Sequence, residues 1–348
     1  MTPDERSIRS VRFAVCGLRI RRKWLFWSAG GRKRIREFAS LYRQARTSPA
    51  AVEPAAAFAD AEAPPASLAA ASLDSEAGRH FRTTTRAVLG FNDDETIARL
   101  RQQAAAATRR RRQLQTWMHV HRGWMPAIEL KGEPHAAIAN ARERPVIHWI
   151  DNTVFAELVA RAGLHQAGIK AHHYSDWVHE YGQSLLSRTI LQRRIFQLEQ
   201  RFMDERIVSH PHTHFRSMRK FAALMRGNGA IFHMNNAYLG RRHTCVPLGP
   251  DTWLIQATAP LNMARRYNAL IVPVTAVELE PLSTYRLEFN QPLEADMSLT
   301  KDEDIARMAA LSASRQLESM KAFPAQWLCW SSSQLAAPEA GRIYRPGM

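Results

Sequence analysis

Residues 144–163 read Arg144-Pro-Val-Ile-His-Trp-Ile-Asp-Asn-Thr-Val-Phe-Ala-Glu-Leu-Val-Ala-Arg-Ala-Gly163, and this stretch decides the fold class. The apolar run at 145–150 predicts a short buried strand. Asp151, Asn152 and Thr153 are residue types that favour helix N-caps, so residues 154–162 are expected to form a helix that ends at Gly163. A strand that leads directly into a helix is the building unit of parallel α/β sheets.

The same alternation continues toward the C-terminus. Further strands are predicted at residues 169–174, 230–233, 269–277 and 285–289, and helices at 183–206, 215–226, 260–267 and 304–321. Strands and helices that take turns predict a mainly parallel sheet covered by helices on both faces. We therefore expect one α/β domain at residues 78–348.

The N-terminal segment carries most of the excess positive charge. The 348 residues include 48 Lys and Arg against 32 Asp and Glu, a net charge of +16, and residues 1–50 alone contribute +10. Aromatic residues such as Trp24, Phe26 and Trp27 lie among these cations. Residues 1–47 are therefore predicted to form a helical segment that attaches to an anionic membrane surface. A solvated basic helix packed on its own domain is the alternative, and nucleic-acid binding is the least favoured.

The composition constrains the rest of the chain. Residues 48–77 are rich in Ala and Pro and predict a linker, whereas residues 94–117 predict a helix whose four consecutive arginines, at 109–112, face solvent. Three widely spaced cysteines argue against a disulfide framework and for a reducing compartment. No apolar run reaches the 18 residues that a membrane-spanning helix needs, which favours a peripheral protein.

Common cofactor and metal motifs are missing from the sequence. It has no Gly-rich phosphate loop, no closely spaced cysteine pair and no Gly-x-Ser-x-Gly elbow. His210, His212 and His214 alternate and could point to one side of an extended segment. No spaced Cys or acidic partner set accompanies them, so we expect neither a metal nor a cofactor.

An ordered series of blocks resembles a known family, the bacterial lipid A biosynthesis (lauroyl/myristoyl) acyltransferases, within the wider lysophospholipid-type acyltransferases. The resemblance covers residues 79–330. Its blocks are Arg86-Ala-Val-Leu-Gly-Phe91 with the acidic residues 93–95, the strand at 145–150, the helix, turn and strand at 218–232, Cys245-Val-Pro-Leu-Gly249, residues 257–274, and Glu318 with Phe323-Pro-Ala-Gln-Trp327. The block at 245–249 is similar to a turn of the family.

The resemblance implies a function in lipid biosynthesis. Such an enzyme moves a fatty acyl group from acyl carrier protein or acyl-CoA to a hydroxyl or amine of a lipid or glycolipid. It needs no further cofactor and works at the cytoplasmic face of the bacterial inner membrane. Acyl carrier protein is acidic, so the basic surface of this chain would attract it.

The sequence departs from the family at the catalytic base. Family members have a His followed five residues later by Asp or Glu, and none of the 14 histidines here has an acid at that spacing. Alignment of the strands places Asn152 at the His position and Glu157 at the acid position. An Asn amide cannot act as a general base near neutral pH. Two hypotheses follow: an acyltransferase with a changed site, or an inactive relative that binds acyl chains or a lipid-synthesis partner.

Other residues could take part in the site. His148 and Asp151 could form a substitute acid–base pair, because His148 and Asn152 share one face of an extended strand. A buried, hydrogen-bonded His148 is the alternative. The family's second acidic position reads His233-Met-Asn235-Asn236 here, which predicts substrate contacts by His233, Asn235 and Asn236. Arg188 is a candidate for holding a phosphate or oxyanion, or an ordinary surface residue.

Overall fold

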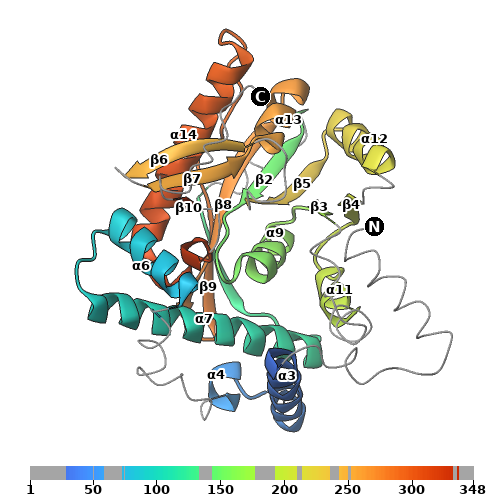
Figure 1. Ribbon diagram of the computed structural model, residues 1–348. Helices are drawn as coiled ribbons and strands as arrows, with labels where there is room; N and C mark the ends of the chain where they lie inside the picture. The colour runs from blue at the N-terminus through green and yellow to red at the C-terminus, as the bar shows by residue number, and fades with distance from the viewer. Residues whose placement is uncertain are drawn as a thin grey trace, which may run out of the picture.

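A seven-stranded sheet forms the centre of the computed structural model, which describes residues 29–49, 51–58, 73, 75–132, 143–176, 193–209, 214–235, 243–249, 252–331 and 335–336 (Figure 1). In order across the sheet the strands are β1 (Ala127–Lys131), β9 (Thr284–Phe289), β8 (Leu270–Glu280), β2 (Val146–Ile150), β5 (Ala230–Met234), β3 (Ala171–Asp176) and β4 (Arg206–Ser209). Only the β8–β9 pair is antiparallel. The expected mainly parallel sheet is confirmed.

The central strand β2 is buried along its whole length. Val146 and Ile150 pack into the core on one face of the sheet, and Ile147 and Trp149 pack into the core on the other. This alternation explains why four of the five residues of β2 are apolar: a parallel strand covered on both faces has no solvent side.

Helices cover both faces, as expected. The first face carries α3 (Ala29–Thr47), α7 (Asp94–Val120), the π-helix η2 (Ala156–Ala160), α9 (Arg161–Gln166) and α11 (Arg193–Glu199). The opposite face carries α12 (His214–Arg226), α13 (Ala259–Tyr267) and α14 (Lys301–Ala322). No helix among these described segments combines the length and apolar character needed to cross a bilayer.

A second, three-stranded antiparallel sheet packs beside the first. It consists of β10 (Leu335–Ala336), β7 (Thr252–Ala257) and β6 (His243–Gly249), and it shares a third core with α6 (Glu76–Leu89), α7 and α14. The sequence predicted a turn at 245–249, which is wrong: these residues lie within β6. Pro247 is tolerated there because β6 is an edge strand, where proline costs no ladder hydrogen bond.

The helix after β2 differs from the prediction. It starts as the π-helix η2 and continues as α9 through Gly163 to Gln166, so Gly163 does not end it. Gly163 serves close packing instead, since a Cβ there would lie 2.6 Å from Leu287 Cδ2. The chain turns away at Gly168, whose φ of +76° suits glycine.

The long helix predicted at 183–206 is shorter and is followed by an unpredicted strand. Within the described residues only α11 (Arg193–Glu199) is helical, and residues 177–192 lie outside that part of the chain. Residue 206 begins β4, which pairs in parallel with β3 at the sheet edge. Helical periodicity could not reveal this, because the pairing partner is distant in sequence.

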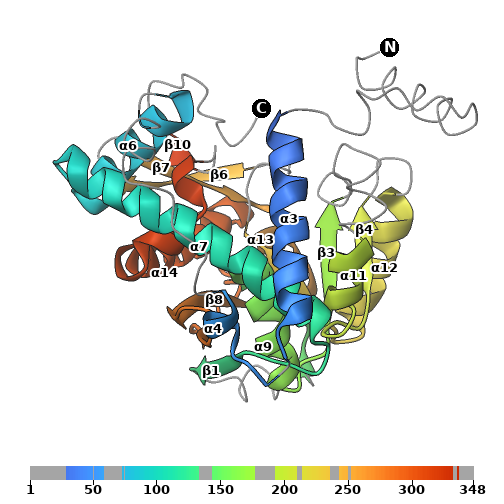
Figure 2. The same ribbon diagram turned by 90° about the horizontal axis from the view of Figure 1, so that it is seen from below.

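The described part of the N-terminal segment packs on the α/β core. Leu41 and Ala45 of α3 are buried, and Arg112 of α7 donates to both carboxylate oxygens of Glu37 at 2.8 and 2.9 Å. Figure 2 shows α3 crossing α7. Within the predicted linker, the short helix α4 (Pro54–Ala57) is followed by Phe58, whose buried ring lies edge-on to Trp117 at 5.9 Å. Residues 1–28 lie outside the described part of the chain.

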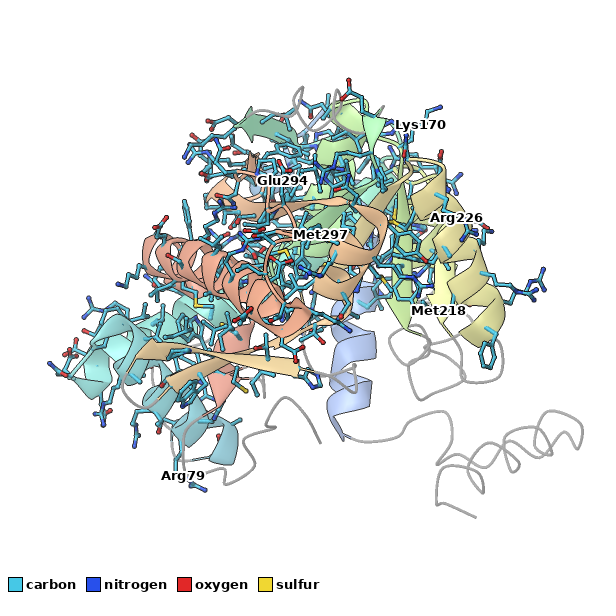
Figure 3. The ribbon with its side chains drawn as sticks, turned by 90° about the horizontal axis from the view of Figure 1, so that it is seen from above. Arg79, Lys170, Met218, Arg226, Glu294 and Met297 are labelled. Carbon is cyan, nitrogen blue, oxygen red and sulfur yellow. The ribbon has the colours of Figure 1, made fainter. Side chains whose placement is uncertain are left out.

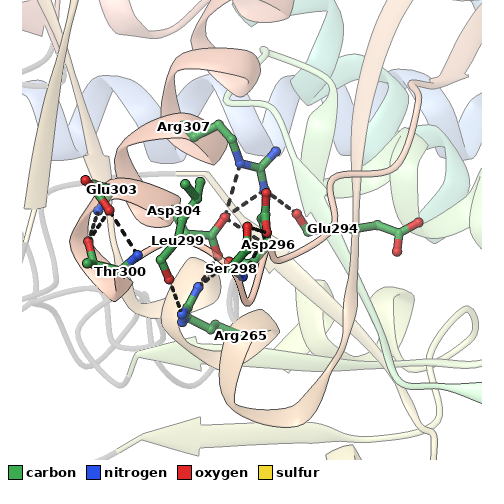
Figure 4. Close-up of polar contacts among 9 residues, drawn as sticks. All are labelled: Arg265, Glu294, Asp296, Ser298, Leu299, Thr300, Glu303, Asp304 and Arg307. Carbon is green, nitrogen blue, oxygen red and sulfur yellow. Dashed lines mark hydrogen bonds and ion pairs between the residues drawn. The ribbon is translucent and has the colours of Figure 1, made fainter.

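A network around buried Asp304 fixes the loop before α14 (Figure 4). Its carboxylate accepts hydrogen bonds from Arg265 at 2.9 Å, Arg307 at 2.7 Å and the Asp296 backbone N–H at 3.1 Å. Burial by itself raises the pKa of Asp304, and these hydrogen bonds outweigh it and hold the pKa below the usual value. Thr300 caps α14 in a capping box, so the loop and the helix start form one rigid unit.

We predict that Gly163→Val destabilises the fold by about 1–3 kcal/mol, because the added side chain overpacks the contact with Leu287. Urea unfolding measures the change. The control Gly123→Val adds the same side chain where no atom lies within 4 Å of the new Cβ. The double variant Gly163→Val/Leu287→Ala should lose less stability than the sum of the two single variants, because a smaller residue 287 relieves the overlap. Equal effects at 163 and 123 would contradict this packing role.

Candidate functional site

The site is located by the point where chain connections diverge. After β2 the chain passes through η2 and α9 on one face of the sheet. After the neighbouring β5 it passes through β6 and β7 of the second sheet and then through α13, on the opposite face, before it reaches β8. Ligand sites of open α/β sheets form outside the carboxyl ends of strands at such a switch point. We therefore place the candidate site at the carboxyl ends of β2 and β5.

Three buried polar residues meet at this switch point. Asp151 and Asn152 follow β2, and Asn235 follows β5. The Asn235 backbone N–H donates to the Ile150 carbonyl at 2.7 Å, which joins the two strand ends. Exposed fractions of 3% for Asp151, 8% for Asn152 and 1% for Asn235 show that all three are almost fully desolvated. The structure thus brings together three of the residues that the sequence selected, while Asn236 and Arg188 lie outside its described residues.

Asp151 is held against the longest strand of the sheet. Its carboxylate accepts a hydrogen bond from the Thr275 hydroxyl at 2.5 Å, and its backbone N–H donates to the Val274 carbonyl at 2.9 Å. Burial raises the pKa of Asp151 to about 7, although the Thr275 hydrogen bond favours the ionised form. The carboxyl group therefore exchanges its proton near neutral pH, the range in which a general base or acid works best.

The residues after Asp151 do not cap a helix, and the predicted N-cap role of Asn152 is wrong. The π-helix starts at Ala156 with Phe155 as its cap residue. Backbone bonds to the C-terminal segment hold this turn instead: the Leu328 N–H donates to the Asn152 carbonyl at 3.1 Å, and the Val154 N–H donates to the Gln326 carbonyl at 2.7 Å.

Gln326, in the 3-10 helix η5 (Pro324–Gln326), secures this segment to β8. Its side-chain oxygen accepts from the Glu278 backbone N–H at 2.7 Å, and its side-chain nitrogen donates to the Glu278 carbonyl at 2.8 Å. A side-chain amide here bonds a strand in the way that a neighbouring strand would. The block at 323–327 therefore has a structural role beneath the candidate site.

Glu157 lies in the π-helix and is engaged by α7. Arg111 donates to its carboxylate at 2.6 Å, and the Glu157 side chain keeps an exposed fraction of 44%. The adjacent arginines also have acidic partners, Glu278 for Arg110 at 2.6 Å and Glu37 for Arg112. The predicted solvated face is confirmed for Arg112, which is exposed, whereas Arg110 and Arg111 are only partly exposed. Each of them joins α7 to a different element.

His148 is completely buried within β2, with no exposed area and its ring edge-on to Phe289 at 6.5 Å. Burial lowers the pKa of His148 to about 4, so the ring stays neutral. Neither ring nitrogen has a hydrogen-bond partner in the described part of the chain. His148 and Asp151 consequently do not form the predicted acid–base pair, and the alternative of a hydrogen-bonded His148 is confirmed only in its burial.

His233 lies on the opposite face of the sheet from His148. Its ring stacks on Tyr174 at 6.1 Å, and Tyr174 packs edge-on against Phe221 of α12. Burial lowers the pKa of His233 to about 4, which makes it a neutral packing residue. Among the described residues, no three or more His, Cys, Asp or Glu side chains lie together in a way that could hold a metal ion.

The structure contains one buried ionic network that was not predicted from the sequence. Arg161 of α9 forms an ion pair with Glu199 and contacts His173 Nδ1 at 3.2 Å, and Arg206 binds the same carboxylate at 2.9 Å. The Arg161 guanidinium also lies 4.9 Å from the centre of the Phe232 ring. The sequence feature that could have predicted this network is Arg161, a charged residue between Ala160 and Ala162 in an apolar helix. The network connects α9 and α11 to β3 and β4.

We predict that His148→Phe makes the fold more stable at pH 5 than the parent, and that the difference shrinks toward pH 7. The native ring takes up a proton only near pH 4 and the unfolded one near 6.5, so stability is lost as pH falls below about 6.5, by up to about 1.4 kcal/mol per pH unit. Urea unfolding at both pH values measures this. Exposed His165→Gln is the control, and a gap independent of pH would contradict the prediction.

Comparisons with known proteins do not identify a relative. No protein-family model matches this chain, and no curated protein matches it. The switch point and its buried polar residues are therefore the basis for assigning a function.

Proposed function

We propose that the protein is an acyltransferase that moves a fatty acyl group from an acyl thioester to a hydroxyl or amine of a lipid or glycolipid. The observation that carries the proposal is the Asp151 carboxyl group, with a pKa of about 7, at the switch point between β2 and β5. The resemblance of residues 79–330 to the lipid A acyltransferases supports the reaction class. Strongly shifted pKa values are concentrated at functional sites.

In the proposed reaction Asp151 replaces the family's histidine as the base. Its carboxylate removes the proton of the acceptor hydroxyl, and the acceptor oxygen attacks the thioester carbonyl carbon. The C–S bond then breaks, and the leaving thiolate takes the proton from Asp151. Side-chain amide N–H groups, which Asn152 and Asn235 supply at the same edge, are suited to stabilise the negative oxygen of the intermediate. Acyl carrier protein or CoA supplies the thioester.

The proposed place of action is the cytoplasmic face of the bacterial inner membrane, with peripheral attachment. A lipid acceptor is presented at a membrane surface, and the net charge of +16 favours an anionic one. The same positive charge favours acyl carrier protein, which is acidic, as the carrier of the acyl group.

We expect Asp151→Asn to lower acyl transfer by about 10²–10⁴-fold, because an amide cannot accept the proton. The assay incubates purified protein with acyl carrier protein and CoA thioesters and a bacterial lipid extract, and mass spectrometry detects lipids that gain one acyl group. Exposed Asp302→Asn, on the first turn of α14, is the control. The Asp151→Asn variant should remain folded, because Asn avoids the cost of a buried carboxyl group that ionises above pH 7. Full turnover in Asp151→Asn would remove Asp151 from the mechanism.

The pH dependence gives an independent check on the same residue. A base whose pKa is about 7 is active in its deprotonated form, so kcat/KM should rise as pH increases through 7 and then level off. Rates measured from pH 5.5 to 8.5, at roughly half-unit steps around this pKa, would show the transition. A profile that is flat across pH 7 contradicts a catalytic role for Asp151.

Glu157 is the second acidic residue to test. We expect Glu157→Gln to lower turnover at least tenfold while the free energy of unfolding changes by less than about 1 kcal/mol, because partly exposed ion pairs contribute little. Arg111→Gln breaks the same ion pair and keeps the carboxylate, so it is the matched control. Equal turnover in the two variants would restrict Glu157 to a structural role.

A second candidate function is binding without catalysis. It is favoured by the missing bond between His148 and Asp151 and by the ion pair that engages Glu157. Such a protein would retain acyl chains or an acyl carrier protein and produce no acylated lipid. Native mass spectrometry that detects a bound acyl chain, together with no turnover beside an active family member, would support this function over the first.

A further inference from the structure

Helix α12 presents a cationic surface with one protruding aromatic ring. We call Phe215, Arg216, Arg219 and Lys220 the α12 patch; all four side chains are exposed. Phe215 has an exposed fraction of 85%, higher than that of any other exposed large hydrophobic residue among the described ones. A large apolar side chain left this far in water needs an explanation.

The patch is fixed outward by the packing of the helix. Ser217, Phe221 and Met225, spaced four residues apart, are buried on the inner side of α12, and the Ser217 hydroxyl donates to the Val208 carbonyl at 2.6 Å. Phe215 could enter the core only if the whole helix rotated and exposed Phe221 and Met225. Its exposure is therefore a stable feature of the helix.

The topology places this patch at the same edge as the candidate site. α12 connects β4 to β5, which run parallel to each other, so the helix runs against the strands and its first turns lie at their carboxyl ends. Asn235 and Asp151 lie at that edge too. In Figure 3 Arg226, at the far end of the helix, lies toward Lys170, which precedes β3, whereas Met218 lies toward the other end.

The charge of the helix is uniform. Residues 214–226 include four Lys and Arg and no acidic residue. Lys220 forms an ion pair with Glu205. Arg216 and Arg219 have no carboxylate within ion-pair distance in the part of the chain that the structure describes, which leaves two cations beside the exposed ring for an outside partner.

We propose that the α12 patch binds an anionic lipid bilayer, with Phe215 entering the headgroup region and Arg216 and Arg219 meeting lipid phosphates. A single protruding ring is too little apolar area for the centre of a specific protein interface. At a bilayer one ring and two or more cations suffice to add binding, since each cation near the surface strengthens it and the ring buries apolar area. The orientation directs the carboxyl edge of the sheet toward the lipid acceptor.

Vesicle sedimentation with the full-length protein tests this. The inference rests on the proposed function for its lipid acceptor, but binding is measured without turnover, so the two can fail separately. Phe215→Ser/Arg216→Gln/Arg219→Gln should reduce partitioning onto phosphatidylglycerol-containing vesicles by roughly tenfold or more, with little binding of any variant to pure phosphatidylcholine. Met297→Ser/Arg79→Gln/Arg266→Gln removes as much charge and an exposed Met at other surfaces and should bind like the parent.

A local probe separates the α12 patch from binding by residues 1–28. Phe215→Cys, labelled with an environment-sensitive fluorophore in a Cys16→Ser/Cys245→Ser background, should brighten and shift to the blue with anionic vesicles. The same label at Met297→Cys should not respond. The proposal is overturned if the protein binds vesicles while the fluorescence of the label at position 215 does not change. It is also overturned if the triple variant binds vesicles as well as the parent does. A response to acyl carrier protein but not to vesicles overturns it in favour of a protein partner.

Discussion

Burial of β2 on both faces is the constraint on which the rest of the structure depends. Its side chains alternate between two separate cores, with Ile147 and Trp149 in one and Val146 and Ile150 in the other. Polar chemistry can therefore begin only where the strand ends. His148 falls within the strand and is held neutral, whereas Asp151 falls just beyond it and keeps a titratable carboxyl group. Burial shifts the two pKa values in opposite directions, because it disfavours the charged form of each group.

Helix α7 is connected to three neighbouring elements by ion pairs. Arg110, Arg111 and Arg112 are consecutive, and each binds an acidic residue on a different element, namely β8, η2 and α3. Consecutive helix positions point in directions about 100° apart, so one short segment can hold three elements that surround it. The side-chain amide of Gln326 adds a fourth connection by bonding the backbone of Glu278. The turn after β2 is then held by the segment that contains Gln326, because the Val154 N–H donates to the Gln326 carbonyl and the Leu328 N–H donates to the Asn152 carbonyl.

The proposed acyl-transfer site and the proposed membrane contact lie at the same edge of the sheet. Parallel strands send their carboxyl ends to one edge of the sheet, and the helix that returns from β4 to β5 begins at that edge. The carboxyl group proposed as the base and the aromatic ring proposed to enter the membrane thus lie at the same end of the sheet, on different elements. The proposed chemistry differs from that of the resembling family at the base, since Asn152 aligns with the family's histidine and the buried Asp151 lies one residue before it.

Local sequence patterns were sufficient to predict the alternation of strands and helices, the central apolar strand and the polar residues at its end, because periodicity and turn residues act over a few positions. They were insufficient for β4, for the π-helix and for the arginines of α7, since these depend on partners distant along the chain. Only the tertiary structure decided that His148 is desolvated and that burial raises the pKa of Asp151 to about 7. Both pKa values follow from which elements close over the side chains, and that closure is a property of the assembled sheet and helices.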